Sequence, residues 1–199
     1  SFLLKSELVN KVNFRLYSLS IRKGIKMKDY TITRTELITV LEKCFIELYT
    51  NDDYLIAHKP AMPSSYDEHL CERTIVFRFA YYLQKYLENN NLLNKLVVDC
   101  DYNRDAYDIK SVGRFMNGTY PDVIVHQRGN NKHNFLVIEF KTYWNRDVQN
   151  DIDKITGFLV EYDYKHVMSI ILEKTLQETL LQIKDHLWDQ SILEKHESL

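Results

Sequence analysis

Two short apolar runs separated by a polar turn form the most informative pattern in the chain. Residues 123–125 form the first run, residues 135–140 form the second, and the segment 128–133 between them is polar and rich in turn-forming residues. Such runs on either side of a turn are typical of a β-hairpin. Asp122 stands just before the first run and Glu139 lies near the end of the second, so a tight hairpin brings these two carboxylates together.

In the second run, the charged side chains lie on one face of the expected strand. Because successive side chains on a strand point to opposite faces, Glu139 and Lys141 share one face and Phe140 takes the other. Hard cations such as Mg²⁺ are held by one or two carboxylates together with water and phosphate oxygens. The spacing therefore predicts a metal site for phosphodiester cleavage, with Asp122 and Glu139 as ligands.

Two further groups would complete such a site. The backbone carbonyl oxygen of Phe140 is available as another metal ligand. Lys141 would lie beside the metal-bound water, where it would orient that water, help to deprotonate it, or offset the negative charge of the transition state. The alternative for Lys141 is a strand-end lysine that shields a sheet edge or pairs with acids.

Apolar periodicity in the rest of the chain predicts an alternation of helices and strands. Thr33 is the expected N-cap of a first helix. Helices are expected at residues 34–49, 66–89, 146–161 and 175–189. Strands are expected at residues 96–100 and 166–172, with a strand or hairpin at residues 12–21. Loops are expected at residues 51–65 and 101–119.

Length and composition fit a compact α/β chain. The 199 residues are 45% hydrophobic and 13% aromatic, with only 5 Gly and 3 Pro, which excludes disordered and fibrous classes. The chain has three cysteines, Cys44, Cys71 and Cys100. Their odd number argues against disulfides, and they lack the spacing of structural zinc ligands. Free cysteines favour a reducing, cytoplasmic location. No apolar run approaches the ~20 residues of a membrane span, and residues 1–30 carry charges throughout. Because the chain begins with Ser1, we expect the native start to be missing or processed.

The charge balance limits how nucleic acid would be bound. A net charge of −2 and a pI near 6.4 exclude a protein that coats nucleic acid nonspecifically, so any phosphate-binding surface must be local. The candidate basic residues are Arg104, Lys110 and Arg114 before the hairpin, Arg73 and Arg78 on the second helix, and Lys132 at the hairpin tip. For each of them the alternative is an ordinary solvated side chain.

Pro121-Asp122, followed by Glu139-Phe140-Lys141 with the two acids 17 positions apart, resembles the signature of the PD-(D/E)xK nuclease superfamily. The resemblance covers roughly residues 66–190. It implies a restriction-endonuclease-like α/β fold with an αβββαβα core, in which helices flank a central mixed sheet. That core would occupy residues 66–199, and residues 1–65 would form an N-terminal extension of a strand or hairpin and a helix packed on it.

The same resemblance implies an activity and its partners. A metal-dependent nuclease would hydrolyse phosphodiester bonds in DNA, or in RNA, by means of a metal-activated water, with Mg²⁺ or Mn²⁺ as the cofactor. Nucleic acid, with DNA favoured, is the implied partner, and no membrane is involved. A homodimer is compatible with the resemblance, because cutting both strands of a duplex requires two sites.

The resemblance also implies roles for two residues outside the hairpin. Glu72 matches the superfamily's helix glutamate and is implied as a catalytic residue and a further metal ligand, direct or through water. It shares an apolar helix stripe with Val76 and Phe79, where a carboxylate is costly to bury unless it is paired or bound to a cation. Its alternative is an ion pair with Arg73 or a nearby lysine. Lys154 matches a basic position on the following helix and is implied as a phosphate contact, the alternative being a solvated helix face.

Two other functions stay open. The fold would also serve a noncatalytic module that binds nucleic acid or a protein, although the intact Asp, Glu and Lys favour the nuclease. In a third interpretation the carboxylates form ordinary ion pairs in a structural protein without metal affinity. Tyr143 and Trp144 would either stack on bases or sugar, or pack the next helix against the sheet.

Overall fold

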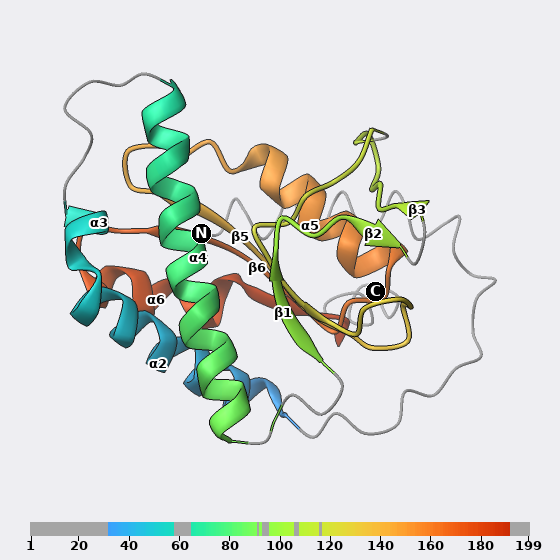
Figure 1. Ribbon diagram of the computed structural model, residues 1–199, viewed down its shortest axis with the longest axis horizontal. Helices are drawn as coiled ribbons and strands as arrows, with labels where there is room; N and C mark the ends of the chain where they lie inside the picture. Colours follow the sequence, from blue (N-terminus) through green and yellow to red (C-terminus); the bar gives the residue numbers. More distant parts are fainter. Residues whose placement is uncertain are drawn as a thin grey trace.

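A five-stranded mixed sheet forms the centre of the fold, and helices cover both of its faces (Figure 1). The computed structural model describes residues 32–57, 65–90, 92, 96–105, 108–115 and 117–191. In their order across the sheet, the strands are β1 (Val97–Cys100), β4 (Val123–His126), β5 (Asn134–Thr142), β6 (His166–Leu172) and β7 (Leu187–Asp189). β5 and β6 run parallel, and the other neighbouring strands run antiparallel.

The helices divide between the two faces of the sheet. α2 (Arg34–Asn51), α4 (Ser65–Asn89) and α6 (Leu176–His186) pack on one face, around a core that includes Phe45, Phe79 and Phe140. α5 (Gln149–Glu161) covers the other face and forms a second core with residues of β4, β5 and β6. The prediction of an α/β fold with a mixed sheet flanked by helices is confirmed. None of the described helices is long and apolar enough to cross a bilayer.

The predicted hairpin is formed by β4 and β5. Val123 pairs with Ile138 in the antiparallel register, which places Asp122 next to Glu139 across the pair. Phe140 points into the core beneath α2 and α4, where its ring lies 5.0 Å from the ring of Phe79. Glu139 therefore points to the opposite face, toward α5, as the alternation of side chains along a strand requires.

The segments on either side of β6 differ from their predicted boundaries. The helix predicted at 146–161 begins only at Gln149, because the chain first makes a turn closed by the pair Thr142 and Asn145. The helix predicted at 175–189 ends at His186, and the next three residues form β7 instead. The apolar side chains Leu187 and Trp188 are buried when β7 pairs with the edge of β6, and this burial favours the strand.

Short elements also occur in the two predicted loops. α3 (Asp53–Ala57) lies within the segment 51–65. A two-stranded ribbon of β2 (Arg104–Asp105) and β3 (Asp108–Ile109) lies within the segment 101–119. The helices predicted at 34–49 and 66–89 and the strands predicted at 96–100 and 166–172 are confirmed to within two residues. The strand or hairpin predicted at 12–21 lies outside the described residues.

The N-cap predicted at Thr33 is confirmed. The backbone N–H of Thr33 donates to Oε2 of Glu36 at 2.7 Å, and the backbone N–H of Glu36 donates to Oγ1 of Thr33 at 3.2 Å. This capping box satisfies backbone groups that the first turn of α2 leaves without helical partners. α2 then packs against α4 and α6, and the division of the chain near residue 65 stays a prediction.

A close packing contact ties the connection before Asp122 to α5. Val112 is fully buried in the core beneath this helix. It approaches Gly157 so closely that a Cβ at Gly157 would collide with the Val112 side chain. Glycine allows this approach because it carries no side chain. The connection is thereby held against the helix that faces Glu139.

Candidate active site

A hydrogen bond between the two hairpin strands fixes Asp122 at the predicted site. Oδ2 of Asp122 accepts from the backbone N–H of Phe140 at 2.7 Å. The Asp122 carboxylate is therefore anchored to the strand segment that carries Glu139 and Lys141. Burial raises the pKa of Asp122 to about 7; the hydrogen bond from Phe140 opposes this rise, and the nearby charge of Glu72 adds to it.

Glu139 is almost completely buried, with 1% of its surface exposed. Nζ of Lys154 donates to its Oε2 at 2.9 Å. Its Oε1 meets no hydrogen-bond donor among the described residues. Burial, and next the charge of Asp122, raises the pKa of Glu139 well above its usual value. An unsatisfied buried acceptor costs about 1–3 kcal/mol, so Oε1 is available to a further ligand.

Lys141 lies between two acids that the sequence places on different helices. Its Nζ is 3.1 Å from Oδ2 of Asp151 on α5 and 3.9 Å from Oε1 of Glu72 on α4. Burial alone would lower the pKa of Lys141, but Asp151 and Glu72 outweigh it and raise that pKa. Lys141 is therefore held as a cation at neutral pH.

Asp151 is a member of the site that sequence reasoning missed. It is 2% exposed, and its Oδ1 lies 3.7 Å from Nζ of Lys154 in addition to its contact with Lys141. Its position three and four residues before Lys154 and Ile155 would have revealed it, because those spacings fall on the same side of a helix. Asp151 also lies in the first turn of α5, where an acid suits the helix dipole.

Glu72 reaches the site from the first helix of the core. Val76 and Phe79 are buried on the same stripe of α4, as the spacing predicted, and Leu83 is buried one turn further on. Only 13% of the Glu72 side chain is exposed, beside Lys141. A nearby lysine thus faces Glu72, while Arg73 next to it is exposed. The helix glutamate and the hairpin acids are brought together although about 50 or more residues separate them in the chain.

The basic residues predicted to contact nucleic acid have different placements. Lys154 belongs to the site itself, through Glu139. Arg104 is exposed on the β2–β3 ribbon. Arg114 is largely exposed and pairs with Asp153 of α5 at 3.2 Å. Lys110 is fully buried, so the nucleic-acid contact predicted for it is wrong: its ammonium group does not reach the surface.

Tyrosines of the segment after α5 surround the Lys110 ammonium. Its Nζ donates to Oη of Tyr164 at 2.8 Å and lies 5.3 Å from the ring centre of Tyr162. Burial lowers the pKa of Lys110 to about 8, and the charge of Asp105 opposes this only in part. Aromatic faces can stabilise a buried cation that has no carboxylate partner. The rings of Tyr162 and Tyr164 therefore explain how the Lys110 ammonium can be buried.

Replacing Lys110 by Met is expected to change how stability depends on pH. The pKa of Lys110 is about 8 in the fold and 10.5 ordinarily, so the native protein should become more stable as pH rises through this window, by up to about 3 kcal/mol. The Met variant should lack this rise. Denaturant unfolding between pH 7 and pH 10.5 measures it, with the exposed Lys132→Met as the control. Identical pH slopes in wild type and Lys110→Met would contradict the assignment.

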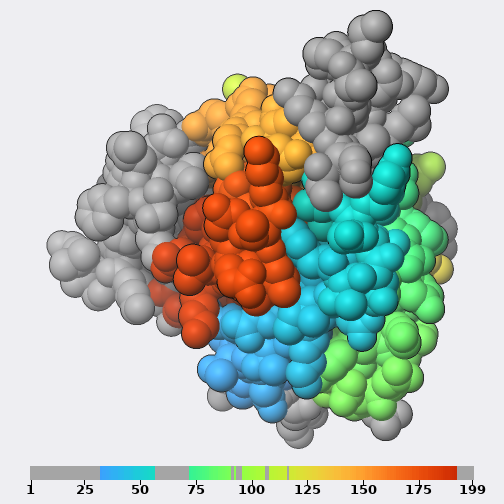
Figure 2. Space-filling model, turned by 90° about the vertical axis from the view of Figure 1, so that its left-hand side faces the viewer, coloured from blue at the N-terminus to red at the C-terminus, as the bar shows by residue number. Residues whose placement is uncertain are grey.

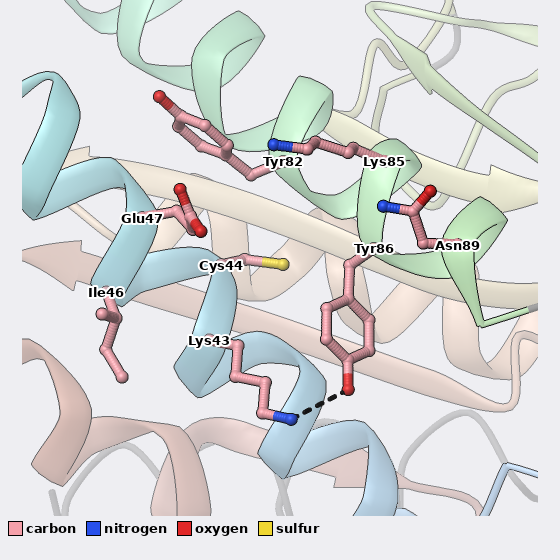
Figure 3. Close-up of a pocket in the computed structure, with 8 residues that line it drawn as sticks. All are labelled: Lys43, Cys44, Ile46, Glu47, Tyr82, Lys85, Tyr86 and Asn89. Carbon is pink, nitrogen blue, oxygen red and sulfur yellow. Dashed lines mark hydrogen bonds between the residues drawn. The ribbon is translucent and has the colours of Figure 1, made fainter.

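A separate hollow of about 240 Å³ lies between α2 and α4 (Figure 3). Lys43 and Tyr86 face each other across it, and Nζ of Lys43 donates to Oη of Tyr86 at 3.1 Å. Cys44 contributes a buried thiol whose pKa is raised to about 12 by burial, which leaves it unreactive. None of the predicted site residues lines this hollow.

The chemistry of the clustered side chains suits a divalent cation. Four carboxylates, from Glu72, Asp122, Glu139 and Asp151, surround the two ammonium groups of Lys141 and Lys154, so negative charge is in excess when all are ionised. Oε1 of Glu139 offers an oxygen without a donor among the described residues. In the part of the chain that the structure describes, no three His, Cys, Asp or Glu side chains have the spacing of a formed metal site. Each lysine instead bridges two of the acids.

No known protein family, no curated protein and no solved structure gave a significant match to this chain.

Proposed function

We propose that this protein is a Mg²⁺- or Mn²⁺-dependent nuclease of the PD-(D/E)xK type, which hydrolyses phosphodiester bonds in DNA or RNA. The observation that carries the proposal is the hydrogen bond from the Phe140 N–H to Asp122. It fixes one carboxylate beside a second, Glu139, whose Oε1 lacks a donor among the described residues. On the same strand face Lys141 provides a positive charge.

The order of the elements supports the proposal. α4, β1, β4, β5, α5, β6 and α6 follow one another along the chain as helix, three strands, helix, strand and helix, apart from the small β2–β3 ribbon. This is the order expected for a restriction-endonuclease-like αβββαβα core. Glu139 and Lys141 lie near the end of β5, a central strand of the sheet.

Each residue has a role that its surroundings favour. Asp122 and Glu139, with the carbonyl oxygen of Phe140, would hold the metal ion, and Glu72 would assist. When bound, that ion supplies an activated water and neutralises charge on the phosphodiester. Lys141 acts as a fixed cation near the developing negative charge, because Asp151 raises its pKa and so keeps it protonated. Glu72 and Asp151 orient Lys141 from two sides.

A noncatalytic binding module is the second candidate. It is favoured by the ion pairs of Lys154 with Glu139 at 2.9 Å and of Lys141 with Asp151 at 3.1 Å. These pairs would neutralise much of the acidic charge without any metal ion. In such a module the cluster would stabilise the fold, and nucleic acid or a protein would be bound elsewhere.

End-labelled DNA and RNA, single-stranded and duplex, separate the two candidates. We expect cleavage of at least one substrate with Mg²⁺ or Mn²⁺ and none with chelator. Lys141→Ala should lower the rate by about 10²-fold or more, the scale found when one preorganised charge-stabilising group is removed. Binding without cleavage of any substrate would favour the module, and cleavage that survives Lys141→Ala would overturn the assigned roles.

A further inference from the structure

An aromatic recess opens at the end of the sheet where β5 and β6 finish. It has a volume of about 510 Å³ and is lined by Tyr143, Trp144, Arg146, Glu173, Lys174 and Glu178. Figure 2 shows the face of the molecule on which the segment after β5, in light orange, lies against α6, in orange-red. Contacts between residues 143–146 and residues 173–178 form the walls.

The recess adjoins the proposed catalytic strand. Tyr143 follows Lys141 by two residues, a distance of roughly 7 Å at the rise of a β-strand. Its backbone N–H donates to the carbonyl oxygen of Leu172 at 2.9 Å, which fixes this turn at the end of β6. Successive nucleotides of a stacked strand are spaced by about 3.4 Å. A substrate with its phosphate near Lys141 would therefore extend a neighbouring nucleotide to the recess.

The aromatic rings and one lysine give the recess the character of a stacking site. The rings of Tyr143 and Trp144 lie 4.6 Å apart, nearly perpendicular at 84°. Nζ of Lys174 lies 5.2 Å from the ring centre of Tyr143. Trp144 packs against the main core, so the platform is held by the sheet and its helices. Rigid aromatic faces next to a cation are the features with which proteins bind unpaired bases and the phosphates beside them.

The acids around the recess are already engaged within the protein. Glu173 pairs with Arg146, and Glu178 accepts from the backbone N–H and the hydroxyl of Thr175 at the start of α6. Lys174 makes no ion pair with a described carboxylate, and its contact is with the Tyr143 ring. The charged side chains of the lining balance, and Lys174 beside the Tyr143 ring is the cation available to a phosphate of a bound strand.

We propose that this recess binds an unpaired nucleobase next to the cleaved phosphodiester, so that the substrate is nucleic acid with a single-stranded segment at the cleavage point. This inference rests on the proposed nuclease function and narrows its substrate class. A base inside a duplex is stacked on both sides and exposes only its edges in the grooves. Only an unpaired base can offer its face to Tyr143 or Trp144.

Fluorescence of Trp144 tests the inference without any cleavage. The second tryptophan, Trp188, is buried and lies on β7, which pairs with the opposite end of β6. Binding is measured by titration with a short oligothymidylate and with a blunt duplex of equal length, in chelator and in the Asp122→Asn background. We expect the single strand to quench Trp144. Tyr143→Leu should weaken its binding by about tenfold, within the factor of 5 to 150 that one stacked base contributes.

Tyr81→Leu provides the matched control, because Tyr81 is an exposed tyrosine on α4 that does not line the recess. Tyr81→Leu should leave the affinity for the single strand within about twofold of that of the Asp122→Asn parent. Tyr143→Leu should likewise leave the affinity for the blunt duplex within about twofold. The proposal that the recess binds an unpaired base would be overturned if Tyr143→Leu left single-strand affinity unchanged. It would also be overturned if Tyr143→Leu weakened the binding of single strand and duplex equally. Metal-dependent cleavage that requires Lys141 would still support the nuclease in that case. Absence of both binding and cleavage would overturn both proposals.

Discussion

Replacing Asp122 by Asn should abolish phosphodiester cleavage and, at the same time, stabilise the fold. The amide removes the negative charge that would hold a metal ion but keeps an oxygen that can accept from the Phe140 N–H. We expect the cleavage rate to fall on the order of 10²–10³-fold or more. Few substitutions that damage only the packing of a protein would have this combination of effects, because they lower stability along with activity.

The stabilisation follows from the buried charge. The pKa of Asp122 is about 7 in the fold and 3.8 ordinarily. The native fold therefore keeps its full stability below about pH 4 and loses up to about 4 kcal/mol as the pH rises through 7 and Asp122 ionises. Asn does not ionise, so the variant should gain on the wild type across this window. Such opposition between stability and activity is expected where function needs a costly buried group.

Denaturant unfolding at pH 4, 6 and 8, together with a cleavage assay at pH 8, measures both effects. Asp108→Asn is the matched control, since Asp108 is exposed on β3 and should change stability by less than about 0.5 kcal/mol. If Asp122→Asn is less stable than the wild type at pH 8, the charge is favourable where it lies. The interpretation that the buried negative charge of Asp122 destabilises the fold would then be wrong.

Replacing Lys154 by Met should destabilise the protein strongly, and a divalent cation should restore part of the loss. Lys154 donates to Glu139 at 2.9 Å, and Glu139 is almost completely buried. Removing one partner of a buried ion pair typically costs about 3–5 kcal/mol, because the other charge is left without compensation. The pKa of Glu139 is already raised by burial, and it should rise further in the variant because the charge of Lys154 no longer lowers it.

A metal ion can replace the lost positive charge only if the site accepts one. Mg²⁺ or Mn²⁺ should therefore raise the melting temperature of Lys154→Met more than that of the wild type, in which the ammonium competes for the same oxygens. At a concentration of 100 times Kd the gain would be about 2.7 kcal/mol. Thermal unfolding with chelator and with each metal measures the difference.

Lys85→Met serves as the control for this substitution, because Lys85 is exposed on α4. Its stability should stay close to that of the wild type and should show no extra response to metal. A Lys154→Met variant that is destabilised but indifferent to both metals would show that the cluster is an ion-pair network only. That result would favour the noncatalytic module.

The hairpin and its sidedness could be predicted because both depend on local pattern. Alternation along β5 placed Phe140 on one face and Glu139 on the other, and the turn between the strands set which ends would meet. The helical spacing of Val76 and Phe79 likewise indicated which face of α4 carries Glu72. These features need only the period of the element and the position of the turn.

Features that depend on distant parts of the chain could not be predicted in the same way. Lys110 is buried because Tyr162 and Tyr164 enclose it, more than 50 residues later in the chain. The apolar spacing of residues 187–189 continues the helical pattern of α6. These residues form a strand because they pair with the edge of β6. Asp151 carried a usable signal, its spacing from buried Ile155 on α5, which is the same argument that identified Glu72.

The hydrogen bond between Asp122 and Phe140 gives the site a built-in spectroscopic reporter. The donor is a main-chain amide, so a ¹H–¹⁵N spectrum contains one resonance for it, and its partner is the carboxylate with the raised pKa. Protonation of that carboxylate weakens a charge-assisted bond and moves the resonance. The protonation state of Asp122 can therefore be followed at a single peak, with no substrate and no turnover.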